Sequence, residues 1–228
     1  MKVLEIKNAH KVYNSSEVKV HAVNGVNLDF EKGEFAAIVG PSGSGKTTLL
    51  NMIGGLDTPT DGEIMVDNTN LAGLKSSKLI DFRMRNIGFV FQSYNLIPVL
   101  TAKENVEFIM SLQNWDKKEK DARTHELLEA VGLGDRMNSR PSKLSGGQQQ
   151  RVAVARALAS KPKFVLADEP TANLDSKSTE TLLEIMEKLN REEGITFIFS
   201  THDARVVKKA RRVITVEDGK VISDEKKN

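Results

Sequence analysis

The chain has 228 residues, of which 39% are hydrophobic, and its 33 basic and 31 acidic residues give a net charge of +2. This length allows one large domain or one domain with an inserted subdomain, and the balanced charge gives no case for a nucleic-acid partner. The absence of cysteine excludes disulfides, thiolate metal sites and cysteine nucleophiles, and no apolar run approaches the roughly 20 residues of a membrane span.

The N-terminal part of the chain alternates polar and apolar residues. The alternation covers residues 3–30, with a turn signal at 23–25, and it resumes at residues 64–68. Such alternation predicts strands with one buried face, so we expect a small antiparallel β subdomain here. Residues 1–6 belong to this pattern, so we expect them to form a strand and not a secretory signal.

Three short apolar runs predict a second, mostly parallel sheet. They cover residues 35–39, 164–167 and 195–200, and a helical pattern follows each of them. Strands that are buried on both faces and alternate with helices are typical of an α/β fold.

The segment after the first apolar run fits the phosphate-binding pattern G-x-x-x-x-G-K-[ST], between a strand and a helix. Gly43 and Gly45 allow the backbone to point N–H groups at phosphates, and the helix adds the positive end of its dipole. Lys46 can reach the β- and γ-phosphates, and the Thr47 hydroxyl can bind Mg²⁺. The candidate ATP-binding residues of this loop are Gly40, Pro41, Ser42, Gly43, Ser44, Gly45, Lys46, Thr47 and Thr48.

Residues from about 94 to 160 have a mostly helical pattern, which predicts a helical subdomain inserted in a single domain of residues 1–228. One helix there has clear ends, because Asp116 can cap it, Glu119 can complete a capping box and Gly132 can stop it. Near the C-terminus, a basic cluster at 208–212 favours a solvated helix face, with anionic lipid contact as the alternative. We expect residues 223–228 to fray.

The run 144–148 reads Leu-Ser-Gly-Gly-Gln and predicts a second phosphate site. Ser145 stands where a helix begins, and Gly146 and Gly147 free the backbone beside it. The helix then points its positive end beyond Ser145. An ordinary helix cap would not need Gly-Gly-Gln in this register, so we interpret Ser145, Gly146, Gly147 and Gln148 as functional.

Polar residues follow the apolar strands. Asp168 and Glu169 end the strand at 164–167, where Asp168 can hold Mg²⁺ and Glu169 can act as a general base on the attacking water. Gln92 and His202 follow the strands at 87–91 and 195–200 in the same way.

Together these motifs resemble the nucleotide-binding subunit of an ATP-binding cassette (ABC) transporter, from Tyr13 to His202. The resemblance implies a P-loop NTPase core and an ATPase that uses Mg²⁺. It also implies that Tyr13 stacks on adenine and that His202 contacts the γ-phosphate. Gln92 would touch Mg²⁺ and water, which gives Thr47, Gln92 and Asp168 as metal residues and Glu169, His202 and Gln92 as catalytic residues.

The resemblance also predicts two partners. The signature residues 145–148 would act in trans on ATP bound to a second copy, in a head-to-tail homodimer with C2 symmetry. Asp175 would lie in the loop by which the two copies communicate. An integral membrane permease would bind the apolar segment 93–101, for which Leu96 and Val99 are the test residues, and would hold the subunit at the cytoplasmic face of the cell membrane. The alternative is that the side chains of this segment pack the helical subdomain.

Segments 91–98, 144–153 and 168–176 are most similar to the lipoprotein-releasing and macrolide-exporter ATPases. Three other classes are weighed against this one: an ABC ATPase that drives a membrane complex without transport, as in cell division; a soluble ABC ATPase; and a simple P-loop kinase or GTPase. The third leaves 144–148 unexplained.

Overall fold

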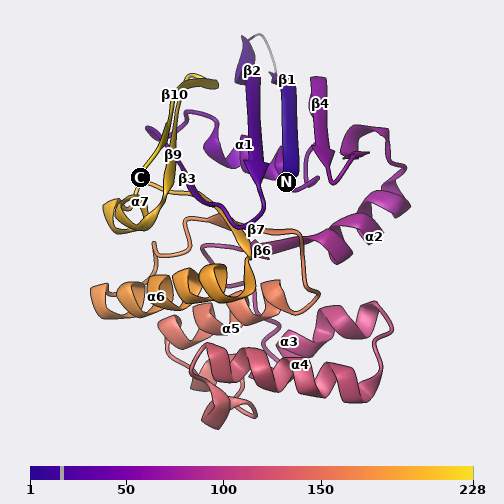
Figure 1. Cartoon of the computed structure of the whole chain (residues 1–228), viewed down its shortest axis with the longest axis vertical. Coiled ribbons are helices and arrows are strands. Elements are labelled where there is room, and N and C mark those ends of the chain that lie inside the picture. The colour runs from indigo at the N-terminus through magenta and orange to yellow at the C-terminus, as the bar shows by residue number, and fades with distance from the viewer. Residues whose placement is uncertain (16–17, 228) are drawn as a thin grey trace.

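The computed structural model describes residues 1–15 and 18–227, and Figure 1 shows its arrangement. Its strands are β1 (Lys2–Ser15), β2 (Val18–Glu31), β3 (Phe35–Val39), β4 (Asp61–Val66), β5 (Thr69–Asn70), β6 (Ile87–Val90), β7 (Phe164–Asp168), β8 (Thr196–Ser200), β9 (Arg212–Glu217) and β10 (Lys220–Lys226). Its α-helices are α1 (Lys46–Ile53), α2 (Ser76–Asn86), α3 (Ala102–Leu112), α4 (Lys117–Ala130), α5 (Gly146–Leu158), α6 (Ser176–Glu193) and α7 (Ala204–Lys209). Three short 3₁₀ turns are η1 (Leu71–Gly73), η2 (Gly134–Arg136) and η3 (Pro141–Lys143).

The strands form two sheets, and both predicted types of sheet are confirmed. The four-stranded sheet has the antiparallel order β2-β1-β4-β5. The six-stranded sheet has the order β10-β9-β3-β8-β7-β6 and is parallel except for its β9–β10 edge. In Figure 1 the antiparallel sheet lies at the top, helices α3 to α6 lie at the bottom, and β6 and β7 lie between them.

In the central strands of the six-stranded sheet, successive residues belong alternately to two hydrophobic clusters. Phe197 and Phe199 of β8 belong to the cluster that contains residues of α3 to α6, whereas Ile198 belongs to the cluster that contains β1, β2 and α1 residues. Both faces of the sheet are therefore buried, which explains why its strands are continuous apolar runs.

The parallel strands place their carboxyl ends at one edge of the sheet. Loop 40–47 follows β3, Gln92 lies just beyond β6, Glu169 follows β7 and His202 lies just beyond β8. This topology brings together residues that are far apart in the sequence, at the position where open α/β sheets bind ligands.

Helices α3, α4 and α5 pack on one another within the predicted helical segment, whose boundaries at 94 and 160 stay a prediction. Asp116 caps α4 as expected and accepts a hydrogen bond from the Lys118 N–H at 2.8 Å. Helix α4 ends at Ala130, and Gly132 follows with φ 67°.

The prediction of a turn at residues 23–25 was wrong. These residues lie inside β2, where the pairing with β1 shifts register near Ala9 and Gly25 has φ 70°. An Asn-Gly pair suits a bulge as well as a turn, because both need a positive φ. The bulge also lets the Asn24 N–H donate to the Gly219 carbonyl at 2.8 Å.

Two expectations for the C-terminal part were also wrong in part. Residues 223–226 do not fray but belong to β10, where Asp224 accepts two hydrogen bonds from Arg212 at 2.8 and 2.7 Å. Residue 228 of this prediction lies outside the described residues. The basic cluster is only in part a helix face, because Lys208 and Lys209 end α7 whereas Arg212 lies in β9 with 5% of its surface exposed. Lys209 pairs with Glu187 at 3.1 Å, and Lys208 is exposed.

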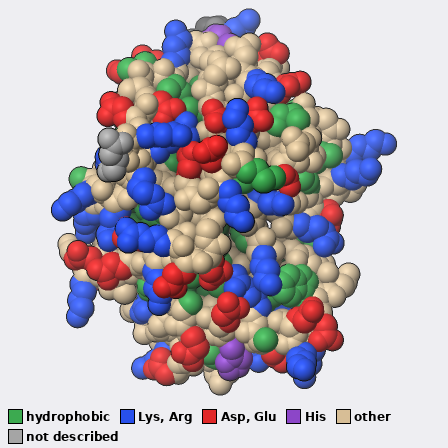
Figure 2. Space-filling view, viewed as in Figure 1, with side chains coloured by type: hydrophobic (Ala, Val, Ile, Leu, Met, Phe, Trp, Pro, Cys, Tyr) green, Lys and Arg blue, Asp and Glu red, His purple; other side chains and the backbone are tan. Residues whose placement is uncertain are grey.

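The surface carries charges of both signs. On the face shown in Figure 2, acidic and basic side chains are interspersed, and apolar side chains form small separate groups. Among the described helices, none combines the length and the apolar character that a membrane span requires.

Candidate nucleotide site

The loop at residues 40–47 is held by close contact with two other elements. Gly45 has φ 99°, and a Cβ there would lie 2.0 Å from the Ala22 carbonyl oxygen of β2. A Cβ on Gly40 would lie 2.0 Å from the Val216 carbonyl oxygen of β9. These two glycines are therefore required by packing, whereas Gly43 with φ 80° has open space where its Cβ would be.

Lys46 lies over this loop. Its side chain is 9% exposed, and its ammonium group donates hydrogen bonds to the carbonyls of Gly40 at 2.9 Å and Pro41 at 2.8 Å. The charge is thus fixed beside the glycine-rich backbone, where it can meet a phosphate.

A cleft of about 950 Å³ opens over the loop. It brings together most of the predicted loop residues with Gln92, Glu169 and His202, which come from the ends of three further strands. The lining residues are Val20, His21, Ala22, Gly40, Pro41, Ser42, Gly43, Gly45, Lys46, Thr47, Thr48, Gln92, Glu169, His202, Asp218 and Gly219. Ser44 is buried behind this surface, and its carbonyl accepts the Gly219 N–H at 3.0 Å.

Glu169 and His202 form a hydrogen-bonded pair at the cleft. Glu169 Oε1 lies 2.7 Å from His202 Nδ1, and Thr201 donates to Glu169 Oε2 at 3.1 Å. The Glu169 backbone has φ 45°, and its N–H donates to the Ser200 carbonyl. The carboxylate is oriented by two partners, while the His202 side chain is 76% exposed and free to meet a ligand.

Asp168 lies beside Thr47, with 3.3 Å between Asp168 Oδ1 and the Thr47 hydroxyl oxygen. Asp168 is the last residue of β7 and pairs with Ser200 of β8. Two oxygen groups predicted to bind metal are thus neighbours.

Gln92 is connected to the loop that contains Asp175. The Gln92 carbonyl accepts a hydrogen bond from the Asn173 amide at 3.0 Å. Asp175 caps α6 and accepts hydrogen bonds from the Ser178 N–H at 2.9 Å and the Ser178 hydroxyl at 2.6 Å. These bonds hold the pKa of Asp175 below its usual value.

Residues 145–148 do not line this cleft. Ser145 and Gln148 form a capping box, in which each side chain bonds to the other residue's backbone N–H. A Cβ on Gly146 would lie 2.7 Å from the Tyr94 hydroxyl, and one on Gly147 would lie 2.7 Å from the Ser178 hydroxyl. Each of these residues thus has a contact within one chain, and its role toward a second copy stays a prediction.

Comparisons with known proteins identify the family. Residues 23–172 match the family model described as ABC transporter. The chain belongs to the ABC transporter family. It is an ATP-binding subunit of this family and an ATPase, as its motifs predicted.

Relatives of this cassette cover its whole length. An uncharacterized ABC transporter ATP-binding protein of Thermotoga maritima is 49% identical over 220 residues, which are 96% of this chain and 94% of the relative. The macrolide export ATP-binding/permease protein MacB of Aggregatibacter actinomycetemcomitans is 44% identical over 100% of this chain, which corresponds to 35% of MacB. The similarity to macrolide-exporter ATPases that the motifs indicated is confirmed.

A solved structure of a related cassette has the same fold. It is the dimeric structure of the ATP-binding cassette MJ0796 in a post-hydrolysis state bound to ADP and Pi. The two chains have a TM-score of 0.90 and 45% identity, with 99% of each chain covered. MJ0796 is a protein of Methanocaldococcus jannaschii.

Tyr13 lies outside the residues that line the cleft of the cassette. Its hydroxyl donates to Asp57 at 2.6 Å, and the Lys11 ammonium lies 5.0 Å from its ring centroid. Burial and the bond to Asp57 raise the pKa of Tyr13. Because Lys11 covers one face of the ring, stacking on adenine would use the other face, and this role stays a prediction.

Sequence reasoning missed one wall of the cleft. Val20, His21 and Ala22 of β2 face the loop, together with Asp218 and Gly219 of the β9–β10 turn. The Asp-Gly pair is a turn signal. Nothing local in the sequence indicates that this turn meets the phosphate-binding loop.

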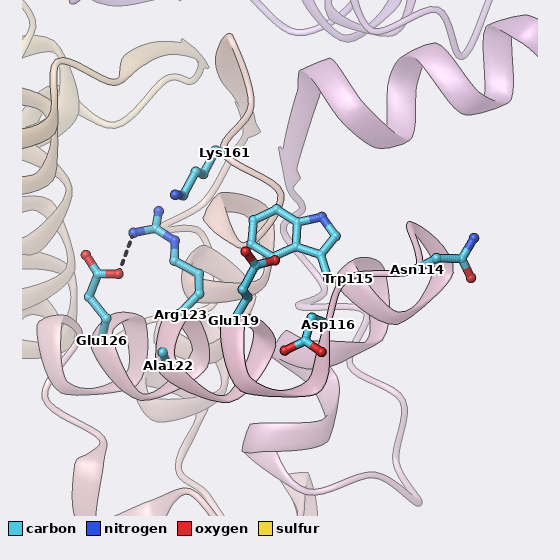
Figure 3. Close-up of a pocket in the computed structure, with 8 residues that line it drawn as sticks. All are labelled: Asn114, Trp115, Asp116, Glu119, Ala122, Arg123, Glu126 and Lys161. Atoms are coloured by element: carbon cyan, nitrogen blue, oxygen red, sulfur yellow. Dashed lines mark ion pairs between the residues drawn. The ribbon is translucent and has the colours of Figure 1, made fainter.

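A second cleft, of about 550 Å³, lies beside α4 and is drawn in Figure 3. It contains Trp115 between charged side chains, but Arg123 is already paired with Glu126 at 3.0 Å and Glu193 at 3.4 Å. Lys161 lies over the Trp115 ring. This cleft contains none of the motif residues, so we place the chemistry in the cleft at loop 40–47.

Proposed function

We propose that this subunit hydrolyses ATP in the cleft at loop 40–47, within a head-to-tail homodimer that drives a membrane permease. The observation that carries the proposal is the composition of the cleft. Within the described residues, it gathers the loop, Gln92, Glu169 and His202 but none of residues 145–148.

The hydrolysis residues have distinct roles in this proposal. Lys46 and the loop N–H groups bind the phosphates. Glu169 takes a proton from the attacking water, and its bonds to Thr201 and His202 orient it for that step. His202, whose side chain is largely exposed beside Glu169, donates to a γ-phosphate oxygen, and Gln92 contacts the water.

The oxygen groups beside the loop fit Mg²⁺. This ion keeps several waters and takes one or two carboxylates together with substrate phosphates. The described residues hold no cluster of three or more His, Cys, Asp or Glu for a metal, and a nucleotide-bound Mg²⁺ needs none. Thr47, Asp168 and Gln92 would hold the ion, which neutralises charge on the β- and γ-phosphate oxygens.

A second copy would complete the site. The capping box leaves further N–H groups at the start of α5 available for a phosphate, and Ser145 lies beside them. Two copies related by a twofold axis would each present Ser145 and α5 to the nucleotide of the other. The related cassette MJ0796 is dimeric in two solved structures, which supports the formation of a dimer.

A groove of about 350 Å³ beside Gln92 fits a short helix of the permease. Its apolar lining includes Phe89, Phe91, Ile97, Phe108 and Ile109. The two residues chosen from the sequence are absent from this lining. Leu96 packs against the hydrophobic core, and Val99 is 72% exposed outside the groove.

The permease would be of the export type found in the macrolide-export relatives, which combine an ATP-binding part with a permease. Binding to such a partner would hold this subunit at the cytoplasmic face of the membrane. Reconstitution with a macrolide-export permease, and transport of a labelled macrolide, would test this choice.

The central test is ATP hydrolysis by the purified chain with Mg²⁺, measured as phosphate release. Lys46→Ala should lose nucleotide binding and turnover, and Glu169→Gln should bind ATP but lower kcat by about 100-fold or more. Full turnover by Lys46→Ala would contradict the assignment of the loop.

A further inference from the structure

Gln150 of α5 connects the two segments that carry Gln92 and Glu169. Its side chain is fully buried at 0% exposure. Its amide nitrogen donates to the Pro170 carbonyl at 2.8 Å and to the Phe91 carbonyl at 3.2 Å. Phe91 directly precedes Gln92, and Pro170 directly follows Glu169.

This bridge lies where the sheet stops connecting the two segments. The pairing of β6 with β7 ends at Val90 and Ala167. Beyond that point the backbones carry the site residues without a shared ladder. A primary amide has two N–H donors, one for each of these two carbonyls. Loss of the amide would leave both carbonyls without this hydrogen bond.

We infer that Gln150 is a positioning residue that holds Gln92 and Glu169 at their working separation by bonding to the carbonyl beside each one. This inference rests on the proposed roles of Gln92 and Glu169.

The test compares kcat of the native chain with those of Gln150→Glu and Gln150→Met. Both variants keep a long unbranched side chain, and both lack the pair of donors at neutral pH. We expect kcat to fall by about tenfold or more, because small displacements of reacting groups are costly. KM and the ATP dissociation constant should stay within about threefold.

Asn190→Asp is the matched control. Asn190 is 3% exposed, and its amide donates to the carbonyls of Gly33 at 3.0 Å and Glu34 at 3.3 Å, in a buried bridge whose residues do not line the cleft. This variant should lower the melting temperature but keep the native kcat per folded molecule. The Gln150 variants should lose kcat even after the same correction for folded fraction.

Gln150→Glu adds a readout that a purely structural role would not move. Protonation gives its carboxyl group one donor, and burial favours the protonated form. The ratio of its kcat to the native kcat should therefore rise as pH is lowered from about 8 to about 6, while the ratio for Gln150→Met stays flat. If the glutamate variant does not fold, the methionine variant and its control decide the test.

Native kcat in both variants, or a loss explained entirely by folded fraction or ATP affinity, would overturn the role of Gln150. The proposed function would then stand, provided that Glu169→Gln has lost turnover. If Glu169→Gln turns over like the native chain, the proposed function fails and the inference about Gln150 fails with it.

Discussion

A single methyl group added at Gly45 would meet the Ala22 carbonyl oxygen at 2.0 Å, in a backbone with φ 99°. Gly45→Ala should therefore lower the free energy of unfolding by at least about 2 kcal/mol, because strain and the clash add. It should also weaken ATP binding, since the clash displaces the loop beside Lys46. Urea unfolding and ATP titration measure the two effects.

Gly73→Ala is the control for this prediction. A Cβ at Gly73 would meet nothing within 4 Å, and its φ is not positive. The control should change the free energy of unfolding by less than about 0.5 kcal/mol. Equal stability of the two variants would show that the loop relaxes away from β2.

At the scale of elements, Asp203 joins the start of α7 to the segment after Glu169. Its carboxylate accepts hydrogen bonds from Arg205 at 2.7 Å and from the Thr171 hydroxyl at 2.8 Å. These bonds, Arg205 first, lower the pKa of Asp203 from 3.8 to about 2. A carboxylate with a depressed pKa stabilises the fold above its unfolded pKa, and this stabilisation is lost as pH falls through the folded pKa.

Asp203→Asn should therefore be less stable than the native chain at neutral pH. The difference in the free energy of unfolding between the two chains should stay constant down to about pH 4 and shrink as pH falls toward about 2. Urea unfolding at a series of pH values measures it. Asp81→Asn, which removes a carboxylate of an exposed ion pair on α2, should show little difference at any pH. If Asp203→Asn were still less stable than the native chain by the same free energy at pH 2, the prediction would be contradicted.

The groove beside Gln92 can be tested on α3. Phe108 is 42% exposed and lines the groove, whereas Leu112 on the same helix is 53% exposed and does not. Phe108→Glu should abolish the stimulation of ATPase activity by the reconstituted permease and leave the basal rate unchanged. Leu112→Glu should keep both rates. If Phe108→Glu is stimulated normally, the permease binds another surface.

At the scale of the whole molecule, ATP should assemble two copies. In Glu169→Gln the nucleotide persists, so light scattering should show a dimer when ATP is added and a monomer without it. Ser145→Arg, introduced in the same background, should remain monomeric and still bind ATP, because Ser145 does not line its own cleft. A double variant that dimerises with ATP would exclude the contact in trans.

Much of the fold followed from the sequence, because several of its patterns are local. Residues 35–39 form a strand with the predicted bounds, since a strand buried on both faces is apolar throughout. A local pattern gave the wrong result at residues 23–25, where Asn-Gly was predicted to form a turn but forms a bulge inside β2.

The prediction of the site depended on which strands have their carboxyl ends close together in the sheet. The parallel order of β3, β8, β7 and β6 gathers the loop, Gln92, Glu169 and His202 as their positions after apolar strands indicated. His21 and Asp218 could not be predicted, because they reach the cleft through pairings of distant segments. The packing of Gly146 on Tyr94 and of Gly147 on Ser178 was invisible for the same reason.

The contacts that hold loop 40–47 have a consequence for synthesis on the ribosome. Strand β3 pairs with β8 and β9, and the Ser44 carbonyl accepts a hydrogen bond from the Gly219 N–H, so these partners lie far beyond the loop in the sequence. A nascent chain has made the whole loop long before these partners emerge. Its ability to retain ATP should therefore arise abruptly, when the β9–β10 turn leaves the exit tunnel, so that nucleotide binding reports that all the partners of the loop have been translated.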